Sequence, residues 1–239
     1  MRRPKGYWYP PGLLYDLAFL TMFRGLRRRV ARAVEDGRLY PWLDVCCGTG
    51  DQLRDRARGR ARGHVPLVRV PVLARSRGHV PGVRVPALCG NELAIGLDLG
   101  FGFVRYAAAR APGVPFVCAD AARLPFNSGS MRAVSVSFGL HDKSPESRAA
   151  ILGEARRVLA PDGRLIAVDF ENPWNAASRA GALVAWAIER LAGGDHYRNG
   201  REFLRRGGLR ALLREHGFAE CERRNIEFGS LGMVVARPL

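Results

Sequence analysis

The chain has 239 residues, 47% of them hydrophobic and 25% charged, which is typical of a soluble globular protein of ordinary core size. No apolar run reaches the roughly 18 residues needed to span a bilayer. The N-terminus also lacks the small-residue cleavage site of a secretory signal, so we expect a cytoplasmic protein. The formal charge of +16 would suit nucleic-acid binding. However, nearly all basic residues are arginines, a skew that codon bias also produces.

The N-terminal part begins with a helical pattern and leads into a buried strand. Apolar spacing predicts an amphipathic helix or helix pair over residues 13–36 and a strand over residues 39–46. The sequence LDVCCGTGD (43–51) then places an acid and two close glycines before a new helix. This layout lets a nucleoside cofactor lie against bare backbone while N–H groups point at it. A plain tight turn is the alternative reading of these glycines.

A repeat interrupts the pattern after this helix begins. Residues 62–73 recur with two changes as residues 77–88, and the regular prolines forbid both a helix and a central strand. We therefore expect residues 59–91 to form an inserted, extended or disordered loop rich in arginine. Its histidines, His64 and His79, recur with the repeat and are not expected to bind a metal.

Strands and helices alternate after the insert. Strands are expected at residues 93–99, 114–119, 131–138, 164–170, 219–228 and 231–237, helices at 101–110, 144–159, 176–191 and 209–216, and a turn at 160–163. Repeated strand–helix units predict a parallel sheet covered on both faces. A short turn joins the last two strands into a hairpin, so one strand must run antiparallel. The expected fold class is α/β, with a Rossmann-like seven-stranded, mostly parallel sheet, an antiparallel C-terminal hairpin and helices on both faces.

Polar groups follow four of the predicted strands in turn. Asp44 and its glycine loop come first, followed by Asp98, Asp120 and the segment 137–142. In an open α/β sheet the ligand site lies beyond the carboxyl ends of the strands. An acid after the second strand suits two ribose hydroxyls. Either aspartate alone could be a helix cap, but their shared order indicates one nucleoside site.

These stretches resemble the class I S-adenosylmethionine-dependent methyltransferases, and more narrowly the ubiquinone/menaquinone biosynthesis C-methyltransferase group. The matching segments are LDVCCGTGDQ (43–52), IGLDLG (95–100), ADAARLPF (119–126), SFGLHD (137–142), EARRVLAPDGRL (154–165) and VDFENP (168–173), with looser matches at GGDHY (193–197) and LLREHGF (212–218). The resemblance implies S-adenosylmethionine as cofactor and requires no metal. We expect an N-terminal helical lid at residues 1–38 and a methyltransferase domain at residues 39–239.

The resemblance also assigns the first loop. Asp44, Cys46, Gly48 and Gly50 would hold the methionine part of the cofactor. Many members carry a glycine where this chain has Cys46; cysteine is small, so the loop is expected to keep its shape.

The later strand ends would complete the cofactor site. By the same resemblance, Asp98 would bind the ribose hydroxyls with Leu99 beside it, Asp120 and Ala121 would contact the adenine, and Ser137 would lie beneath the methyl-donating sulfonium.

The resemblance also suggests a residue that covers the cofactor and a residue that acts on the methyl acceptor. Tyr15 looks like the aromatic residue that covers the cofactor in this group, with a plain packing residue as the alternative. The quinone-type enzymes read Arg-Asn after Phe-Gly-Leu, where this chain has His141-Asp142. That arginine is proposed to help remove a proton from the ring substrate. An imidazole could act as a base near neutral pH, and a solvent-facing loop residue is the alternative reading of His141.

The leading function is methylation of a small molecule, with a quinone-like aromatic as the suggested acceptor, at carbon or oxygen. The alternatives are an RNA methyltransferase and a non-catalytic nucleic-acid-binding protein that uses the basic insert. No aromatic base-stacking motif follows the fourth strand, which disfavours nucleic acid as the partner. The N-terminal helix could also rest on an anionic membrane surface. The oligomeric state is not predicted.

Overall fold

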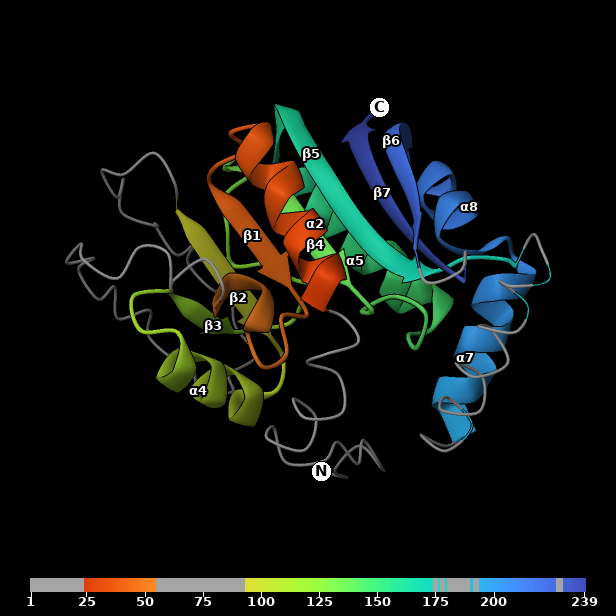
Figure 1. Ribbon diagram of the computed structural model, residues 1–239, viewed down its shortest axis with the longest axis horizontal. Coiled ribbons are helices and arrows are strands. Elements are labelled where there is room, and N and C mark those ends of the chain that lie inside the picture. Colours follow the sequence, from red (N-terminus) through yellow and green to blue (C-terminus); the bar gives the residue numbers. More distant parts are fainter. Residues whose placement is uncertain are drawn as a thin grey trace.

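The computed structural model describes residues 24–54, 93–173, 194–226 and 230–239, together with residues 176, 179 and 190. The strands are β1 (Trp42–Val45), β2 (Ala94–Asp98), β3 (Phe116–Cys118), β4 (Met131–Ser137), β5 (Leu159–Phe170), β6 (Phe218–Ile226) and β7 (Leu231–Pro238). The helices are α2 (Arg24–Asp36), α4 (Phe101–Arg110), α5 (Pro145–Val158), α7 (Gly194–Arg205) and α8 (Gly208–Glu215). They surround one twisted sheet (Figure 1).

The sheet has seven strands in the order β3-β2-β1-β4-β5-β7-β6. β1 pairs in parallel with both β2 and β4, whereas β7 is antiparallel to both β5 and β6. The strand order reverses direction between β1 and β4, and such a switch point is where open α/β sheets bind ligands. The expected Rossmann-like fold with an antiparallel C-terminal hairpin is confirmed.

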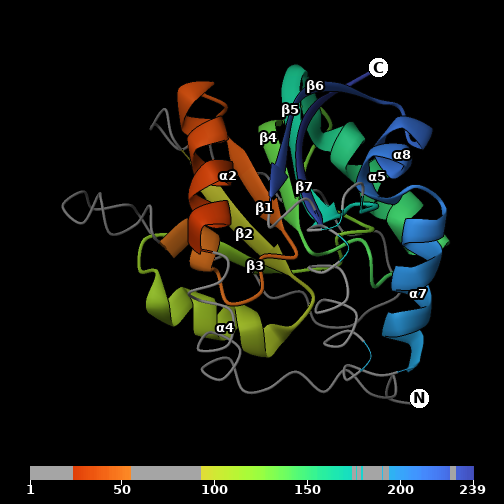
Figure 2. The same ribbon diagram turned by 45° about the vertical axis from the view of Figure 1, so that its right-hand side comes forward.

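Two apolar layers enclose this sheet. On one face, Leu26, Val30 and Val34 of α2 pack on Trp42, and their spacing of four residues forms the buried stripe of an amphipathic helix. On the other face, apolar side chains of α5 and α8 pack around Leu43. Figure 2 shows α2 and α5 on opposite sides of the strands. The described part of the predicted N-terminal helix is thus a core helix, and the residues before Arg24 lie outside the described range.

Around α5 the structure agrees with the predicted start of the helix but not with the turn predicted after it. Ser144 caps this helix by accepting a hydrogen bond from the Ser147 N–H at 3.3 Å, and Pro145 occupies its first turn, as predicted. The turn expected at 160–163 is instead a bulge inside β5. Pairing with β4 begins at Leu159 and resumes at Arg164, so strand pairing on both sides of the turn residues absorbs them into one long strand.

The sequence did not predict α7. Its only buried residues are Gly200 and Phe203, so it has little of the apolar periodicity that identifies a helix. The insert at 59–91 and most of the helix expected at 176–191 lie outside the described residues. Within the described ranges, no helix is long and apolar enough to cross a bilayer.

Gly96 of β2 allows the ring of Phe116 in β3 to pack on the strand. A Cβ at position 96 would lie 2.4 Å from Cδ1 of that ring. We expect Gly96→Ala to destabilise the fold by about 1–3 kcal/mol through overpacking, measured by urea denaturation. Gly153→Ala in α5, where nothing lies within 4 Å, is the control and should stabilise by about 0.5–1 kcal/mol. Equal stability of Gly96→Ala and wild type would contradict the packing.

Candidate cofactor and acceptor site

The loop after β1 combines a packed glycine with an open one. Gly50 has φ +71° and Gly48 has φ +53°, a region that glycine enters without steric cost. A Cβ at Gly50 would lie 2.7 Å from the Cβ of Ala107 in α4, whereas nothing lies within 4 Å of the corresponding position at Gly48. Gly50 therefore serves packing against α4. The bare backbone at Gly48 leaves room that a bound nucleoside cofactor could use.

Cys46 has a left-handed backbone conformation, at the position where many members of the resembled family carry a glycine. Its φ is +56°, which costs a non-glycine residue energy. The neighbouring strand end accommodates its side chain because residue 139 is a glycine: a Cβ there would lie 2.9 Å from the Cys46 Sγ. Cys46, Cys47 and Cys118 are partly buried and Cys221 is exposed.

Asp44 lies behind the loop instead of at its open side. The side chain is 3% exposed, and its Oδ1 accepts hydrogen bonds from Ser135 Oγ at 2.6 Å and Gln52 Nε2 at 2.7 Å. Gln52 also accepts from Ser137 Oγ at 3.3 Å. The predicted Asp44 and Ser137 are therefore linked through Gln52, which with Ser135 forms a polar cluster that sequence reasoning did not single out. We expect Asp44 to act on the cofactor by shaping the loop.

Ionisation of Asp44 should make stability depend on pH. Burial raises the pKa of this carboxyl from 3.8 to about 7. A raised pKa contributes stability that is complete below pH 3.8 and is lost as the pH rises through 7. At 1.36 kcal/mol per pKa unit, the loss is on the order of 4 kcal/mol.

The variant Asp44→Asn should remove this pH dependence, because its amide oxygen can still accept both hydrogen bonds but cannot ionise. We expect the thermal midpoint of the wild type to fall relative to that of Asp44→Asn between pH 4 and pH 8. Parallel midpoint curves would show that Asp44 does not titrate in this range.

Asp98 joins the second strand end to the glycine loop. Its Oδ2 accepts the Gly48 N–H at 2.9 Å and its Oδ1 accepts the Gly100 N–H at 2.8 Å. A carboxylate has about four lone-pair positions, so each oxygen can accept a further bond. The partly exposed Asp98 thus presents a pair of anionic acceptors beside the open backbone of Gly48, which fits a ligand with vicinal hydroxyls.

The next strand end extends the same edge. Asp120 is exposed and accepts the Ala122 N–H at 2.9 Å, while Ala121 is buried in the core. Leu99 lies between these elements with 70% of its surface exposed, which leaves an apolar side chain available to a ligand. Following the strand order β3-β2-β1-β4, these predicted residues lie along one edge in the order Asp120, Asp98, Asp44 and Ser137.

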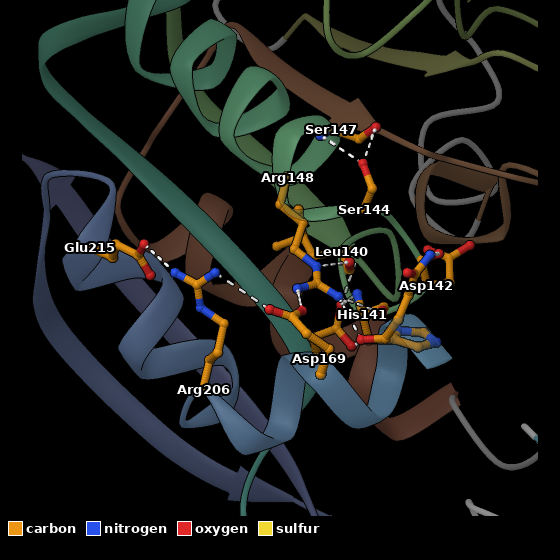
Figure 3. A network of polar contacts seen from close by, with 11 residues as sticks. Leu140, His141, Asp142, Ser144, Ser147, Arg148, Asp169, Arg206 and Glu215 are labelled. Atoms are coloured by element: carbon orange, nitrogen blue, oxygen red, sulfur yellow. Dashed lines mark hydrogen bonds and ion pairs between the residues drawn. The ribbon is translucent and has the colours of Figure 1, made fainter. Parts of the chain in front are cut away.

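The loop after β4 is held from one side by a buried aspartate at the end of β5 (Figure 3). Asp169 is fully buried, and its Oδ2 accepts the N–H groups of Leu140 at 3.1 Å and His141 at 3.2 Å. Its Oδ1 accepts the Phe170 N–H at 2.9 Å and lies 2.7 Å from His141 Nδ1. One carboxylate thus fixes both the backbone and the ring of His141.

His141 is buried, so the solvent-facing alternative is wrong. The residue is 4% exposed, and the carboxylate beside Nδ1 favours the tautomer that carries its proton there. In that tautomer Nε2 has the lone pair. The pair can therefore act as an oriented general base.

Aromatic rings surround this base. The Phe170 ring lies edge-on to His141 at 4.7 Å and to Phe138 at 6.3 Å between centroids. The His196 ring of α7 lies 5.6 Å from that of His141. Such rings suit a planar aromatic ligand.

A second aspartate–histidine pair adjoins the first. Asp142 Oδ2 lies 3.3 Å from His196 Nε2 and 2.5 Å from Lys143 Nζ. Burial opposes ionisation of Asp142, but His196 and Lys143 outweigh it and hold the pKa of this carboxyl well below its usual range. Asp142 is therefore a carboxylate at neutral pH, and it draws α7 towards the loop that carries His141.

Sequence reasoning missed Asp169 and His196 as members of the site. Asp169 ends a predicted strand, so the rule that singled out Asp98 and Asp120 could have found it. His196 offered no such signal because it lies on α7, which was not predicted.

Comparison with known proteins agrees with this arrangement. Residues 78–167 match the methyltransferase domain family. A demethylmenaquinone methyltransferase of Beutenbergia cavernae is 33% identical over 156 residues, which cover 61% of this chain and 64% of that protein. One of Mycobacterium tuberculosis is 40% identical over 162 residues, which cover 68% of this chain and 56% of that protein. The matched part of the chain is therefore similar to methyltransferase domains.

Comparison with solved structures shows the same fold. A TehB-like SAM-dependent methyltransferase from Corynebacterium glutamicum superimposes with a TM-score of 0.52 at 12% identity, covering 95% of this chain and 99% of that one. The chain spans 56–64% of the length of the two curated methyltransferases described above.

Proposed function

We propose that this chain is a methyltransferase that uses S-adenosylmethionine to methylate a small, planar aromatic acceptor of the quinol type. The observation that carries this proposal is the His141–Asp169 pair, which joins the loop after β4 to the end of β5 at the same sheet edge as Asp98 and the open backbone of Gly48. The relatives are named as methyltransferases of demethylmenaquinone, a quinone. The aromatic surroundings of His141 support an acceptor of that chemistry.

Separate groups of residues would bind the cofactor and remove the proton from the acceptor. Gly48 and Gly50 shape the loop for the methionine part of the cofactor, with Asp98 at the ribose and Asp120 at the adenine. When bound, the cofactor supplies an electrophilic methyl group. His141 Nε2 accepts the proton from the acceptor hydroxyl or ring carbon, and Asp169 stabilises the resulting imidazolium.

The protein also positions the acceptor. The rings of Phe138, Phe170 and His196 hold a planar acceptor and exclude water from the base. Removing His141 should therefore cost about 10²–10⁴-fold in kcat, the usual range for a general base.

The lid and the membrane contact belong to this proposal. The lid expected at residues 1–38 includes the core helix α2, so the cover over the cofactor would come from the residues before Arg24, with Tyr15 as the covering aromatic. Tyr15 lies outside the described residues. On α2, Arg28 and Arg29 are exposed, and their charge supports peripheral contact with an anionic membrane that holds a lipid-like acceptor.

Two measurements test the function. Calorimetry should detect binding of S-adenosylmethionine, and a methyl-labelled cofactor should transfer its label to 1,4-naphthalenediol under anaerobic conditions, with the product identified by mass spectrometry. Absence of cofactor binding would overturn the proposal. Binding of RNA or DNA with a steep salt dependence, and no label transfer, would instead favour a nucleic-acid-binding protein.

A further inference from the structure

Arg148 of α5 is a buried cation with no role in the reaction described above. The residue is 1% exposed. Burying a guanidinium is costly unless its donors are satisfied, so its partners show what the fold gains from it.

Two of these partners are the backbone carbonyls of the segment that carries the base. Arg148 Nε donates to the Leu140 carbonyl at 2.9 Å and Nη2 donates to the His141 carbonyl at 3.0 Å. Asp169 binds the N–H groups of these same two residues. Leu140 and His141 are therefore held through their N–H groups by an anion and through their carbonyls by a cation (Figure 3).

The remaining partners of Arg148 lie on α7. Nη2 also donates to the Asn199 carbonyl at 2.7 Å, and Nη1 pairs with Glu202. The Asn199 side chain returns a hydrogen bond to the Asp142 carbonyl at 2.8 Å. One planar guanidinium thus joins α5, the loop after β4 and α7.

We propose that Arg148 is a positioning residue for the methyl transfer: it fixes His141 from the carbonyl side and docks α7, with His196, against it. This inference rests on the proposed function, because it assigns Arg148 an effect through the base His141. Lysine cannot replace it, since an ammonium is a compact donor that lacks the planar fork needed to reach several acceptors at fixed angles.

The test measures kcat at saturating S-adenosylmethionine with 1,4-naphthalenediol as the acceptor. Arg148→Lys should lower kcat about tenfold or more, since a displaced catalytic group is costly even over small distances. The calorimetric affinity for S-adenosylmethionine should stay within about twofold of wild type, because no partner of Arg148 belongs to the cofactor loop. Glu202→Gln, which keeps both carbonyl bonds and weakens only the link to α7, should give a smaller loss of kcat.

Arg157→Lys is the matched control on the same helix. Arg157 donates to the carbonyls of Leu124 at 3.0 Å and Phe126 at 2.8 Å and pairs with Glu154, a comparable network away from His141. The Arg157 side chain is 35% exposed against 1% for that of Arg148, so Arg157→Lys should lower the thermal midpoint less. Only Arg148→Lys should show the large loss of kcat.

A double-mutant cycle separates positioning from general destabilisation. If Arg148 acts through the base, His141→Ala/Arg148→Lys should be no slower than His141→Ala alone, as expected for groups that work as a unit. Losses that multiply, or an unchanged kcat in Arg148→Lys, would overturn the inference alone. Absence of cofactor binding, or wild-type kcat in His141→Ala, would overturn the proposed function and this inference with it.

Discussion

Replacing Asp169 by asparagine should lower kcat for 1,4-naphthalenediol by about 10³-fold, within the range attributed to general-base catalysis. The amide oxygen can still accept the N–H groups of Leu140 and His141, but its NH₂ group then faces His141 Nδ1. A donor at that position forces the imidazole to carry its proton on Nε2, where the base needs its lone pair.

Steady-state kinetics with saturating cofactor would measure this loss. Asp162→Asn is the matched control on the same strand, because the exposed side chain of Asp162 forms an ion pair with the exposed Arg132. The control should retain kcat, since exposed ion pairs contribute little. An Asp169→Asn enzyme within threefold of the control would refute the assigned tautomer.

The second large effect is expected at Asp98. Asp98→Asn should weaken the binding of S-adenosylmethionine by about 100-fold. Charge-assisted hydrogen bonds contribute about 1.5–3 kcal/mol each, and the neutral amide would also place an NH₂ group against the N–H of Gly48 or Gly100.

Isothermal titration calorimetry of the two aspartate variants distinguishes the two sites. Asp98→Asn should lose cofactor affinity, whereas Asp169→Asn should keep it and lose turnover. Equal cofactor affinity in Asp98→Asn and wild type would remove Asp98 from the binding site.

Much of the fold was predictable because its signals are local. The cap at Ser144, the apolar strands and the turn to β7 each depend on neighbouring residues. The placing of Asp44, Asp98, Asp120 and Ser137 near one edge also followed from the sequence, because parallel strands bring their carboxyl ends together.

The rest depended on contacts between distant residues. His141 and Asp169 are 28 positions apart, and Arg148 reaches Glu202 across 54 positions. No local pattern specifies such pairs; they arise from the pairing of β4 with β5 and from the docking of α7. Residue-level reasoning therefore identified His141 as a candidate base but not the groups that orient it.

The hydrogen bond between Gly48 and Asp98 has a consequence for how this gene can change. It closes the site across 50 sequence positions, and β1 and β2 lie side by side from Trp42 to Val45. The chain between the glycine loop and β2 can therefore lengthen by duplication at low thermodynamic cost, since closing a chain of twice the length adds only about 0.6 kcal/mol. Residues added between Arg54 and Leu93 leave the strand pairing and this hydrogen bond in place, so the two halves of the site can stay together while the chain between them grows.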